Sequence, residues 1–566
     1  AGTKLWSAPR AGRRQANERP DLPEHPHFLK TTPNPSIQMK RSTSLNRIKS
    51  ADGPFDVVVI GGGASGLGAA LDAAARGHSV ALFEQSDFAK GTSSRSTKLV
   101  HGGVRYLQQG NISLVLEALR ERGRLARNAP HLVHSQAFVI PNYSWWEGPF
   151  YGIGMKVYDQ LAGKLGLSPS RHLSKKETIE KLPTVETDKL VGGVIYHDGQ
   201  FDDSRLAVNL AQTAEELGAA MLNYCRCVGL VKEQDVVCGV EIHDVENDER
   251  FTVRAKSVIN ATGVFVDELR QMDEPEANKI IAVSQGIHFV LPKRFLPGDA
   301  AIMIPKTADG RVLFAVPWRD HVVVGTTDTP LGGYSLEPRA LEEERDFVMT
   351  HACKYLAEDP TDDDVLSVFA GLRPLVKAGD GSDTAALSRD HSILISGSGL
   401  ITLTGGKWTT YRKMAEDVID QAETLAGLDH KRCQTEDMQI HGWTQSQITE
   451  GNLEPYGADA FEIRELLKAE PELAQPIHAQ LPVQEAEVVW HAREEMARTV
   501  EDVLARRTRC LLLNAAASIE AAGAVAAILA RELGRDTAWE AAQVADYTAL
   551  ARGYVYKAPE STAASA

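Results

Sequence analysis

The stretch from Phe55 to Glu84 constrains the fold most, because it reads as strand, glycine-rich turn, helix and strand. Residues 55–60 form an almost unbroken apolar run, as expected of a parallel strand that is buried on both faces. Three glycines then satisfy the pattern G-x-G-x-x-G: Gly61, Gly63 and Gly66. In this pattern the glycines permit a tight turn and let the backbone approach a pyrophosphate, toward which the next helix directs its N–H groups. The unit predicts a Rossmann-like dinucleotide site.

The second strand of this unit, residues 79–83, ends in Glu84, eighteen positions beyond Gly66. At about that distance a carboxylate receives the ribose hydroxyls of an adenine dinucleotide. Glycine triplets also arise by chance, but the strand–helix–strand context and the acidic residue make this match strong. We expect Ala64 and Ser65, in the same turn, to contact the cofactor. The motif alone does not choose between FAD and NAD.

The length of 566 residues gives room for about three or four domains. A hydrophobic fraction of 43% and a charged fraction of 24% are typical of a soluble globular protein. No window approaches the roughly 18 uninterrupted apolar residues that a membrane-spanning helix needs. Peripheral attachment to a membrane stays open.

The charge is unevenly distributed, with +7 on residues 1–50 and −22 on the remainder. An acidic body argues against nucleic acid as the main partner. The basic arm, residues 1–50, lacks a sustained apolar period, so we expect it to be largely disordered. It has no apolar core suited to a secretion signal. An inert extension is favoured over a lipid-binding arm or the remnant of a transit sequence.

The six cysteines include no C-x-x-C pair and are too sparse for a disulfide framework in so long a chain. Reduced thiols in a cytosol-like compartment are the simplest interpretation. Cys225 and Cys227 alternate along a predicted strand and would face opposite sides of it, which argues against joint metal binding. The sequence also contains no calcium loop of the D-x-D-x-D-G type, and no metal site is expected.

A long segment after Glu84, GTSSRSTKLVHGGVRY from Gly91 to Tyr106, resembles the signature of the FAD-dependent glycerol-3-phosphate dehydrogenases. In that family the part corresponding to Thr92, Ser93 and Ser94 contacts the flavin cofactor, and residues 101–106 pass close to the flavin ring. The resemblance therefore implies FAD as the cofactor, a choice that the glycine motif leaves open.

Two later segments are similar to cofactor-binding turns of the same family. The first, residues 257–263, is a strand ending in Ala-Thr-Gly, so Ala261 and Gly263 are expected beside the dinucleotide. The second, GGKWTTY at residues 405–411, turns into a helix. The resemblance places Gly406, Lys407 and Thr409 beside the flavin ring, where the helix dipole and the lysine favour negative charge on reduced flavin.

The resemblance also implies a set of substrate-binding residues. His288 lies in an alternating strand and matches the family's active-site histidine, although a lone histidine on a strand is more often a core residue. Arg373 and Arg389 match arginines that the family uses around a substrate phosphate, and guanidinium is suited to phosphate oxygens. Arg105 and Tyr106 are expected to grip the same substrate. His288 is the predicted base, with Arg373 and Lys407 as rivals.

The predicted fold is α/β, with a Rossmann-like FAD-binding domain, an inserted antiparallel β substrate cap and a C-terminal helical domain. The predicted divisions are an arm at 1–50, the FAD domain with its cap at 51–430, and the helical domain at 431–566. The cap is expected at roughly 107–200 and 280–366. Within the helical domain the predicted segments include 483–506 and 511–533. Asp202 and Asp203 are expected to cap a helix rather than act as a catalytic carboxylate pair.

Residues 141–166 bring aromatic side chains close to glycines and are followed by basic residues. Such a composition is compatible with a lipid headgroup boundary, but packing of the rings between subdomains is slightly favoured.

The resemblance implies oxidation of sn-glycerol 3-phosphate to dihydroxyacetone phosphate by hydride transfer to FAD, with electrons passed to a membrane quinone. We expect a peripheral protein on the cytoplasmic face of the cell membrane, with a homodimer as one candidate assembly. Two alternatives stay open. One is an oxidase that returns the electrons to oxygen and forms hydrogen peroxide, and the other is a flavin-binding protein without turnover.

Overall fold

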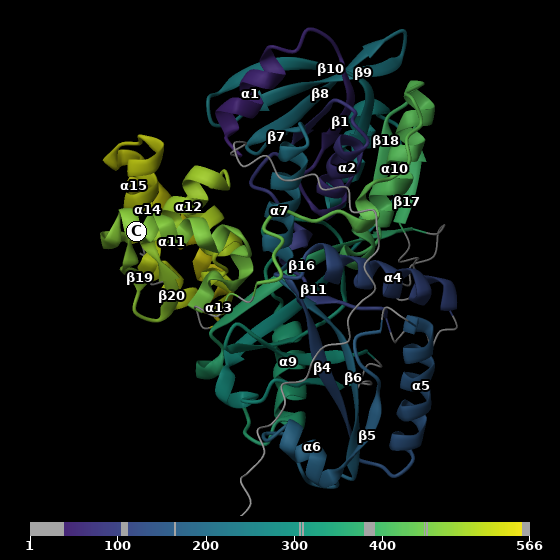
Figure 1. The fold of residues 1–566 in the computed structure, drawn as a ribbon, viewed down its shortest axis with the longest axis vertical. Helices are drawn as coiled ribbons and strands as arrows, with labels where there is room; N and C mark the ends of the chain where they lie inside the picture. The colour runs from purple at the N-terminus through teal and green to yellow at the C-terminus, as the bar shows by residue number, and fades with distance from the viewer. Residues whose placement is uncertain are drawn as a thin grey trace, which may run out of the picture. The chain divides into compact units, whose positions relative to one another are not determined.

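The computed structural model describes residues 39–103, 111–163, 166–304, 307, 311–377, 391–446, 448 and 451–556. Three of the predicted substrate-binding residues lie outside the described residues: Arg105, Tyr106 and Arg389. The chain forms a mixed α/β structure with two large sheets and a helical C-terminal part, as predicted (Figure 1).

The first sheet is built on β1 (Phe55–Ile60), which pairs in parallel with β2 (Val80–Phe83) and β10 (Glu249–Asn260). Its main path runs in the order β17-β18-β10-β1-β2-β7. The remaining strands of this path are β17 (His391–Ile395), β18 (Ile401–Gly405) and β7 (Ala220–Leu222). An antiparallel pair, β8 (Cys225–Glu233) and β9 (Val236–Asp244), extends from β10. The glycine turn therefore opens at the carboxyl end of a central strand, where open α/β sheets bind ligands.

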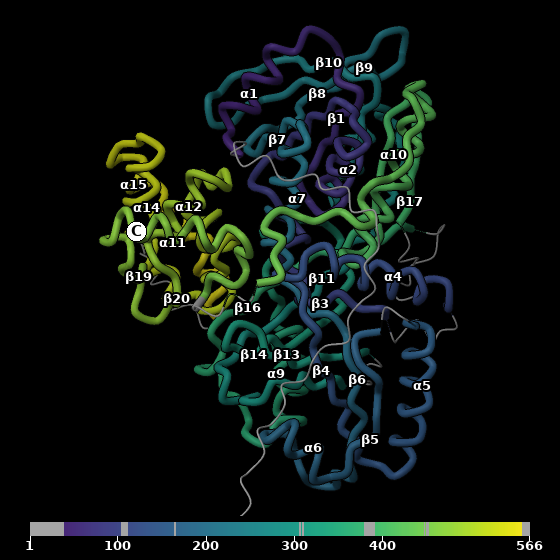
Figure 2. Tube along the Cα trace, in the orientation of Figure 1, coloured from purple at the N-terminus to yellow at the C-terminus, as the bar shows by residue number. Residues whose placement is uncertain are grey.

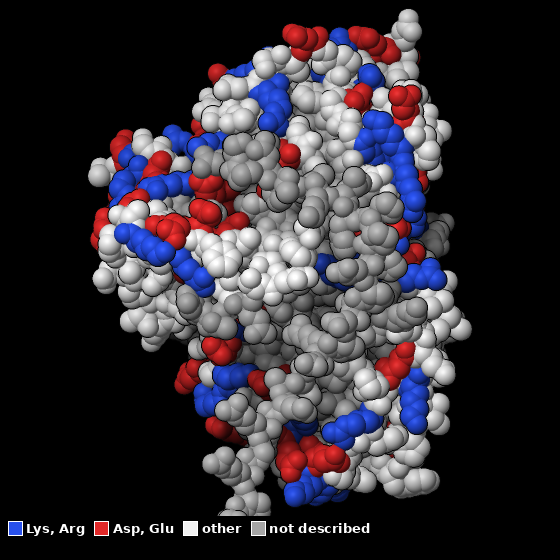
Figure 3. All heavy atoms as spheres, in the orientation of Figure 1, with Lys and Arg blue, Asp and Glu red and all other residues white. Residues whose placement is uncertain are grey.

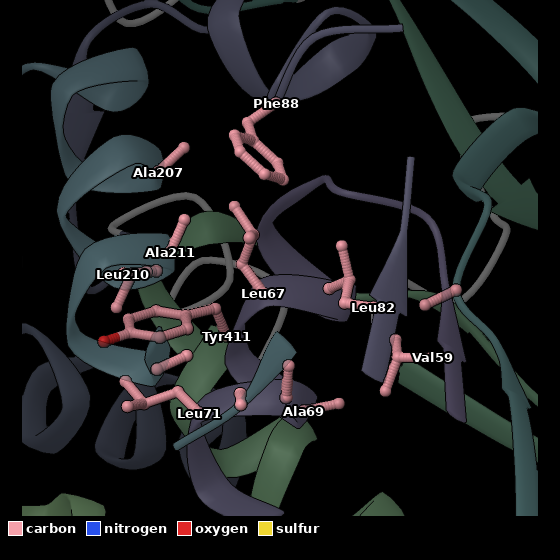
Figure 4. Close-up of a cluster of buried hydrophobic side chains, with 14 of the residues drawn as sticks. Val59, Leu67, Ala69, Leu71, Leu82, Phe88, Ala207, Leu210, Ala211 and Tyr411 are labelled. Carbon is pink, nitrogen blue, oxygen red and sulfur yellow. The ribbon is translucent and has the colours of Figure 1, made fainter. Parts of the chain in front are cut away.

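The helix after the glycine turn is α2 (Ala64–Ala75), which packs against α7 (Asp203–Glu216) and α10 (Tyr411–Ala426). Figure 4 shows Leu67 and Leu71 of α2 among alanines and Leu210 of α7 and the ring of Tyr411 from α10. Alanine and glycine on α2 let these helices approach closely, since a Cβ on Gly68 would lie 2.9 Å from the Tyr411 ring. The small side chains of α2 thus allow this helix to be buried between its neighbours.

The second sheet has ten strands, most of which fall within the two residue ranges predicted for the cap. Its main path runs in the order β15-β11-β14-β13-β12-β4-β6-β3, and β16 and β5 pair beside β11 and β6. The strands are β3 (Leu99–Val100), β4 (Val133–Asn142), β5 (Arg171–Ser174), β6 (Gly192–Phe201), β11 (Ile281–Pro292), β12 (Ala301–Ile304), β13 (Leu313–Trp318), β14 (His321–Gly325), β15 (Thr329–Leu331) and β16 (Ser367–Val376). The pairing is antiparallel except between β12 and β4. Figure 2 shows β4 and β6 side by side, although residues 143–191 separate them in sequence.

The helices that accompany this second sheet are α4 (Ile112–Asn128), α5 (Glu147–Ala162), α6 (Lys175–Lys181) and α9 (Glu342–Tyr355), whereas α8 (Val266–Asp273) contacts β8 and β18 of the first sheet. Asn111 is the N-cap of α4, and its side chain accepts a hydrogen bond from the N–H of Leu114. α6 begins with a capping box of the S-x-x-E type, formed between Ser174 and Glu177. α5 contacts α4, β5 and β6.

The C-terminal part contains α11 (Asp459–Ala469), α12 (Glu485–Glu494), α13 (Cys510–Leu513), α14 (Ala515–Leu533) and α15 (Thr537–Ala551), with a hairpin of β19 (Pro476–His478) and β20 (Leu481–Gln484). Figure 1 shows most of these elements gathered together. The predicted continuous segment 483–506 is wrong, because α12 ends at Glu494 and a π-helix resumes at Asp502–Arg507. Between them, buried Glu495 binds Arg205, and Met496 adopts a left-handed backbone with φ 51°.

The predicted disordered arm is wrong over its last residues, because Arg41–Lys49 forms the helix α1. Arg41 is buried and its guanidinium lies 2.5 Å from the carboxylate of Asp244. Ser44 and Ile48 are also buried. A buried face made of an arginine, a serine and an isoleucine has no clear apolar period, so the sequence pattern did not reveal the helix.

A buried network of charges joins the C-terminal part to the first sheet and its helices. Arg506 and Arg507 both bind Asp87, at 2.5 and 2.7 Å, and together they hold the pKa of that carboxyl at about 2. Arg509 binds Asp203 at 3.0 Å. Asp202 caps α7 by accepting from the N–H of Arg205, which agrees with its predicted role. Because these charges have lost their hydration, removing one partner of a pair is strongly destabilising.

The exposed charges do not form a continuous basic surface on the face drawn in Figure 3, where blue and red residues are interspersed over the described parts of the chain. A protein that binds nucleic acid concentrates Lys and Arg on one face. Among the described residues, no helix is both long and apolar enough to cross a lipid bilayer.

Candidate functional site

A first cavity lies at the carboxyl ends of β1, β2 and β10 and holds about 1370 Å³ of empty space, counted out to its open mouth. Most residues predicted to bind the cofactor line it: Gly61, Gly63, Ala64, Ser65, Glu84, Thr92, Ser93, Ala261, Gly263, Gly406 and Lys407. These residues come from four separate stretches of the chain. The cavity therefore brings together the segments that sequence reasoning treated as separate motifs.

The glycines of the turn are required by close contacts rather than by flexibility. Gly61 has φ +111°, and a Cβ there would lie 2.5 Å from the carbonyl oxygen of Ala261. A Cβ on Gly66 would lie 1.9 Å from the carbonyl oxygen of Gly61. Gly63 faces the cavity, and its Cβ would meet only the Ser93 hydroxyl, at 3.1 Å. The turn thus keeps its backbone exposed to a ligand while helix and strand pack tightly behind it.

Glu84 occupies the end of β2 and lines the first cavity. Its carboxylate accepts hydrogen bonds from the N–H groups of Gly62, at 2.6 Å, and Ser86, at 2.9 Å. Burial raises the pKa of Glu84, whereas these two N–H groups lower it. Two backbone donors fix the carboxylate at the cavity wall, which is the position that binding to a ribose hydroxyl requires.

The segment Thr92–Ser94 forms a short 3₁₀ helix that three hydrogen bonds fix in place. The Ser93 hydroxyl accepts from the N–H of Ala64 at 2.9 Å, and the Trp408 indole donates to the Ser93 carbonyl at 2.8 Å. The Thr92 hydroxyl donates to the carbonyl of Leu372 at 2.6 Å. The glycine turn, the Thr-Ser-Ser segment and the Gly-Gly-Lys turn therefore form one rigid wall.

A second cavity, with about 990 Å³ of empty space counted to its mouth, is lined by residues of the ten-stranded sheet and its neighbours. Arg373 on β16 lines it, and the next residue, Pro374, lines the first cavity. The Arg373 guanidinium donates to the carbonyl of Thr327 at 2.9 Å and lies 3.2 Å from the carboxylate of Asp328. Arg373 and Pro374 are consecutive on β16, so the two cavities come close to each other beside this strand, although no described residue lines both.

Gly286 on β11 makes room for this guanidinium. A Cβ on Gly286 would lie 2.3 Å from a terminal nitrogen of Arg373 and 2.4 Å from the hydroxyl of Thr326. The side chain of Arg373 remains 27% exposed, so part of its donor fork faces the second cavity. Guanidinium in this position is suited to an anionic ligand.

His288 lies on β11 and is only 3% exposed. Its Nε2 is 2.9 Å from the hydroxyl of Thr97, and its ring stacks on Phe369 at 4.8 Å. Burial lowers the pKa of His288 well below the usual range, and the nearby cations Lys98 and Arg373 lower it further. His288 is therefore neutral near pH 7, the protonation state that a general base requires.

The structure does not place every predicted residue at a cavity wall. Gly66 and Ser94 are buried behind the first cavity, and Thr409 accepts a hydrogen bond from the N–H of His101. His288 lies behind Thr97 and is not among the described residues that line either cavity. Sequence reasoning missed Thr97 and Cys227, both of which line cavities. Thr97 belongs to the segment Gly91–Tyr106, so that match already contained the signal for it.

We expect Gly66→Ala to abolish retention of the dinucleotide, because the new methyl group would overlap the Gly61 carbonyl. The measurement is flavin absorbance after purification and gel filtration. Gly523→Ala in α14 is the matched control, because a Cβ added there would meet nothing within 4 Å beyond its own helix backbone. This alanine should raise the free energy of unfolding by about 0.5–1 kcal/mol. Flavin content equal to wild type in Gly66→Ala would contradict the assigned turn.

Comparison with known proteins relates these features to a family. The sequence matches the family of FAD dependent oxidoreductases over residues 56–412, and the C-terminal domain of alpha-glycerophosphate oxidase over residues 398–541. It is 40% identical over 528 residues to the mitochondrial glycerol-3-phosphate dehydrogenase of Mus musculus, covering 87% of this chain and 72% of that protein. A mitochondrial glycerol-3-phosphate dehydrogenase of Arabidopsis thaliana is 39% identical, with 85% and 84% covered.

The solved structure of glycerol-3-phosphate dehydrogenase from Bacillus halodurans, complexed with FAD, superposes with a TM-score of 0.72 at 28% identity. The match covers 91% of this chain and 97% of that one. Likeness over this length indicates the same overall fold, and the lining of the first cavity fits the same cofactor. The chain therefore belongs to the FAD-dependent glycerol-3-phosphate dehydrogenase family, and its cofactor is FAD.

Proposed function

We propose that this protein oxidises sn-glycerol 3-phosphate to dihydroxyacetone phosphate and passes the electrons to a membrane quinone. The observation that carries the proposal is the position of Arg373 at the second cavity, next in sequence to Pro374 at the first. A phosphate held by Arg373 leaves the carbon chain of a small substrate directed toward the first cavity. The names of the relatives support the choice of glycerol 3-phosphate.

Each substrate contact has a proposed role. Arg373 holds the phosphate and orients the carbon that is oxidised, which lowers the entropic part of the barrier. His288, behind the cavity wall, is the final acceptor of the proton from the C2 hydroxyl. Arg105, Tyr106 and Arg389 remain predicted substrate-binding residues from the sequence, because they lie outside the described residues.

FAD, when bound, supplies the acceptor for the hydride that leaves C2. The protein side of this site consists of Lys407 and the turn that begins α10. An ammonium group and the N-terminus of a helix both favour negative charge nearby. In our proposal, Lys407 and this helix N-terminus stabilise the negative charge that the cofactor carries after reduction.

Anaerobic mixing of the FAD-loaded protein with sn-glycerol 3-phosphate tests this function. Flavins usually absorb at about 450 nm, and this absorption band should bleach within seconds. An amino acid and a 2-hydroxy acid serve as controls and should leave the band unchanged. Absence of bleaching with glycerol 3-phosphate would favour the alternative of a flavin-binding protein without turnover.

An oxidase is the second candidate, and the match of residues 398–541 to the C-terminal domain of alpha-glycerophosphate oxidase supports it. The substrate chemistry would be the same, because the two activities differ in which acceptor reaches the reduced cofactor. Peroxide yield measured against reduction of a soluble quinone separates them. We expect quinone reduction to dominate, and stoichiometric peroxide would assign the oxidase activity.

The surface of α5 supports attachment to a membrane. Its buried side places Met155 and Tyr158 in the core, while the other side exposes large apolar residues at helical spacing. The exposed residues, with their exposed fractions, are Trp145 (82%), Trp146 (48%), Phe150 (56%), Ile153 (67%) and Val157 (41%). The predicted packing of all these rings between subdomains is therefore wrong. Tyr143 packs against Tyr355 at 6.0 Å, and Tyr151 is partly buried against a core cluster that includes Leu119.

We expect the double substitution Phe150→Ser and Ile153→Ser to weaken binding to vesicles of phosphatidylcholine and phosphatidylglycerol about tenfold in cosedimentation. Phe461→Ser, at a residue 45% exposed on α11, is the control and should bind as wild type does. Equal binding of the double variant would exclude α5 as the lipid contact. If light scattering shows a homodimer that the double variant dissociates, the face is a dimer interface instead.

The location belongs to the same proposal. We propose a peripheral protein at the cytoplasmic face of a quinone-containing cell membrane. The relatives' names place those proteins in mitochondria. Fractionation of the native source distinguishes the two locations.

A further inference from the structure

His288 is separated from the second cavity by one hydroxyl group. Thr97 lines that cavity, and its Oγ1 lies 2.9 Å from Nε2 of His288. The other ring nitrogen, Nδ1, is buried and has no hydrogen-bond partner among the described residues. Within the described structure, the path from the His288 ring to the cavity therefore runs through Nε2 and the Thr97 hydroxyl.

We propose that Thr97 is a catalytic residue that relays the proton from the C2 hydroxyl of the substrate to His288. This inference rests on the proposed function and adds a residue to it. In the relay, Thr97 Oγ1 accepts the substrate proton while its own proton moves to Nε2 of His288. The C2–H bond breaks as hydride leaves for FAD, and the C2–O bond becomes a carbonyl, so protons and electrons balance.

The protein holds both members of the pair in place. A Cβ on Gly325 would lie 2.3 Å from the His288 ring, and Phe369 stacks on the ring. Next to Thr97, the Lys98 ammonium is fully buried, lies 2.7 Å from Asp203 and donates to the Ser94 carbonyl at 2.8 Å. Ser96 donates to Asp203 through its hydroxyl at 2.7 Å. The residues on both sides of Thr97 are thus anchored to one buried carboxylate.

The charges around His288 make the proton affinity of its ring depend on whether substrate is bound. Lys98 and Arg373 both disfavour a positive charge on the ring. A phosphate dianion bound at Arg373 offsets that repulsion, because opposite charge nearby favours the protonated imidazole. The base therefore gains proton affinity when the substrate is bound. In the free protein it stays neutral and its Nε2 keeps its hydrogen bond to Thr97.

Substitutions at Thr97 test the relay in the FAD-loaded protein by anaerobic stopped-flow with sn-glycerol 3-phosphate. Thr97→Val keeps the shape and removes the hydroxyl, so the rate of flavin reduction at saturating substrate should fall about 100-fold. Thr97→Ser restores the hydroxyl and should stay within about fivefold of wild type. The Michaelis constant should change little, because the loss is in the chemical step. Equal rates for wild type and Thr97→Val would overturn the proposal.

A structural effect is separated from the relay by two comparisons. Thr178→Val removes another buried hydroxyl, one that donates to the Ser174 carbonyl in α6, and should leave the rate unchanged. Thr97→Val added to His288→Gln should slow reduction no further, because residues that act as one unit are not additive. A multiplied loss in the double variant, or a loss in Thr97→Ser as large as in Thr97→Val, would also overturn it. Failure of the wild-type protein to react would instead overturn the proposed function.

Discussion

Replacing His288 with glutamine is expected to slow reduction of the bound flavin by about 100-fold to 10,000-fold, the usual contribution of a general base. Glutamine reaches toward the Thr97 hydroxyl as the imidazole does, but its amide has no basic nitrogen. The first cavity does not include His288, so FAD content should equal that of wild type. Anaerobic stopped-flow at saturating glycerol 3-phosphate measures the rate.

His321 provides the matched control for this substitution. It lies on β14, paired with β11 opposite Pro292, and its Nδ1 is 2.7 Å from the carbonyl of Arg319. His321→Gln therefore changes a histidine of the same sheet without touching either cavity, and its rate should match wild type. If His288→Gln reduces flavin at the wild-type rate, the base must be sought at Arg373 or Lys407.

Replacing Arg373 with methionine is expected to lower kcat/KM for glycerol 3-phosphate by about 1000-fold, because charged hydrogen bonds contribute roughly 1.5–3 kcal/mol each. Methionine retains much of the apolar stem but offers no donor to a phosphate. Activity with glycerol, which has no phosphate, should change far less, so the preference for the phosphorylated substrate should collapse. Steady-state assays with an artificial electron acceptor give both values.

Arg294→Met controls for the loss of an arginine from an ion pair. Arg294 binds Asp364 at 2.5 Å on the surface, as Arg373 lies beside Asp328 at the cavity. Its substitution should leave kcat/KM unchanged. Arg373→Lys should recover only part of the loss, since an ammonium is a point charge without the planar donor fork. An unchanged preference for glycerol 3-phosphate over glycerol in Arg373→Met would remove Arg373 from the phosphate site.

Local sequence predicted the elements whose determinants are contiguous. The strand Phe55–Ile60 has the predicted bounds because apolar residues continue through it, and the glycine turn follows from contacts that only glycine allows. The N-cap at Asp202 was also predicted from the sequence, because capping depends on a few adjacent residues. By contrast, α1 and the break after Glu494 depend on partners about 200 to 300 residues away, Asp244 and Arg205.

The candidate site divides in the same way. Sequence motifs and family resemblance together named most of the first cavity, including Glu84 and Lys407. They named His288 and Arg373 but gave no distance between them. They also gave no reason to separate Thr97 from its neighbours in the segment Gly91–Tyr106.

By itself, the sequence determined that a dinucleotide binds at Gly61, Gly63 and Gly66, because backbone geometry at a tight turn is a local property. Only the tertiary structure decided which polar groups meet across the sheets. Pairing of β11 with β16 and β14 brings Arg373 and Gly325 close to His288, and packing against the FAD-binding part places Thr97 at its Nε2. The Thr97–His288 contact joins residues 191 positions apart, and the geometry of all these contacts comes from sheet register and core packing, which no short stretch of sequence encodes.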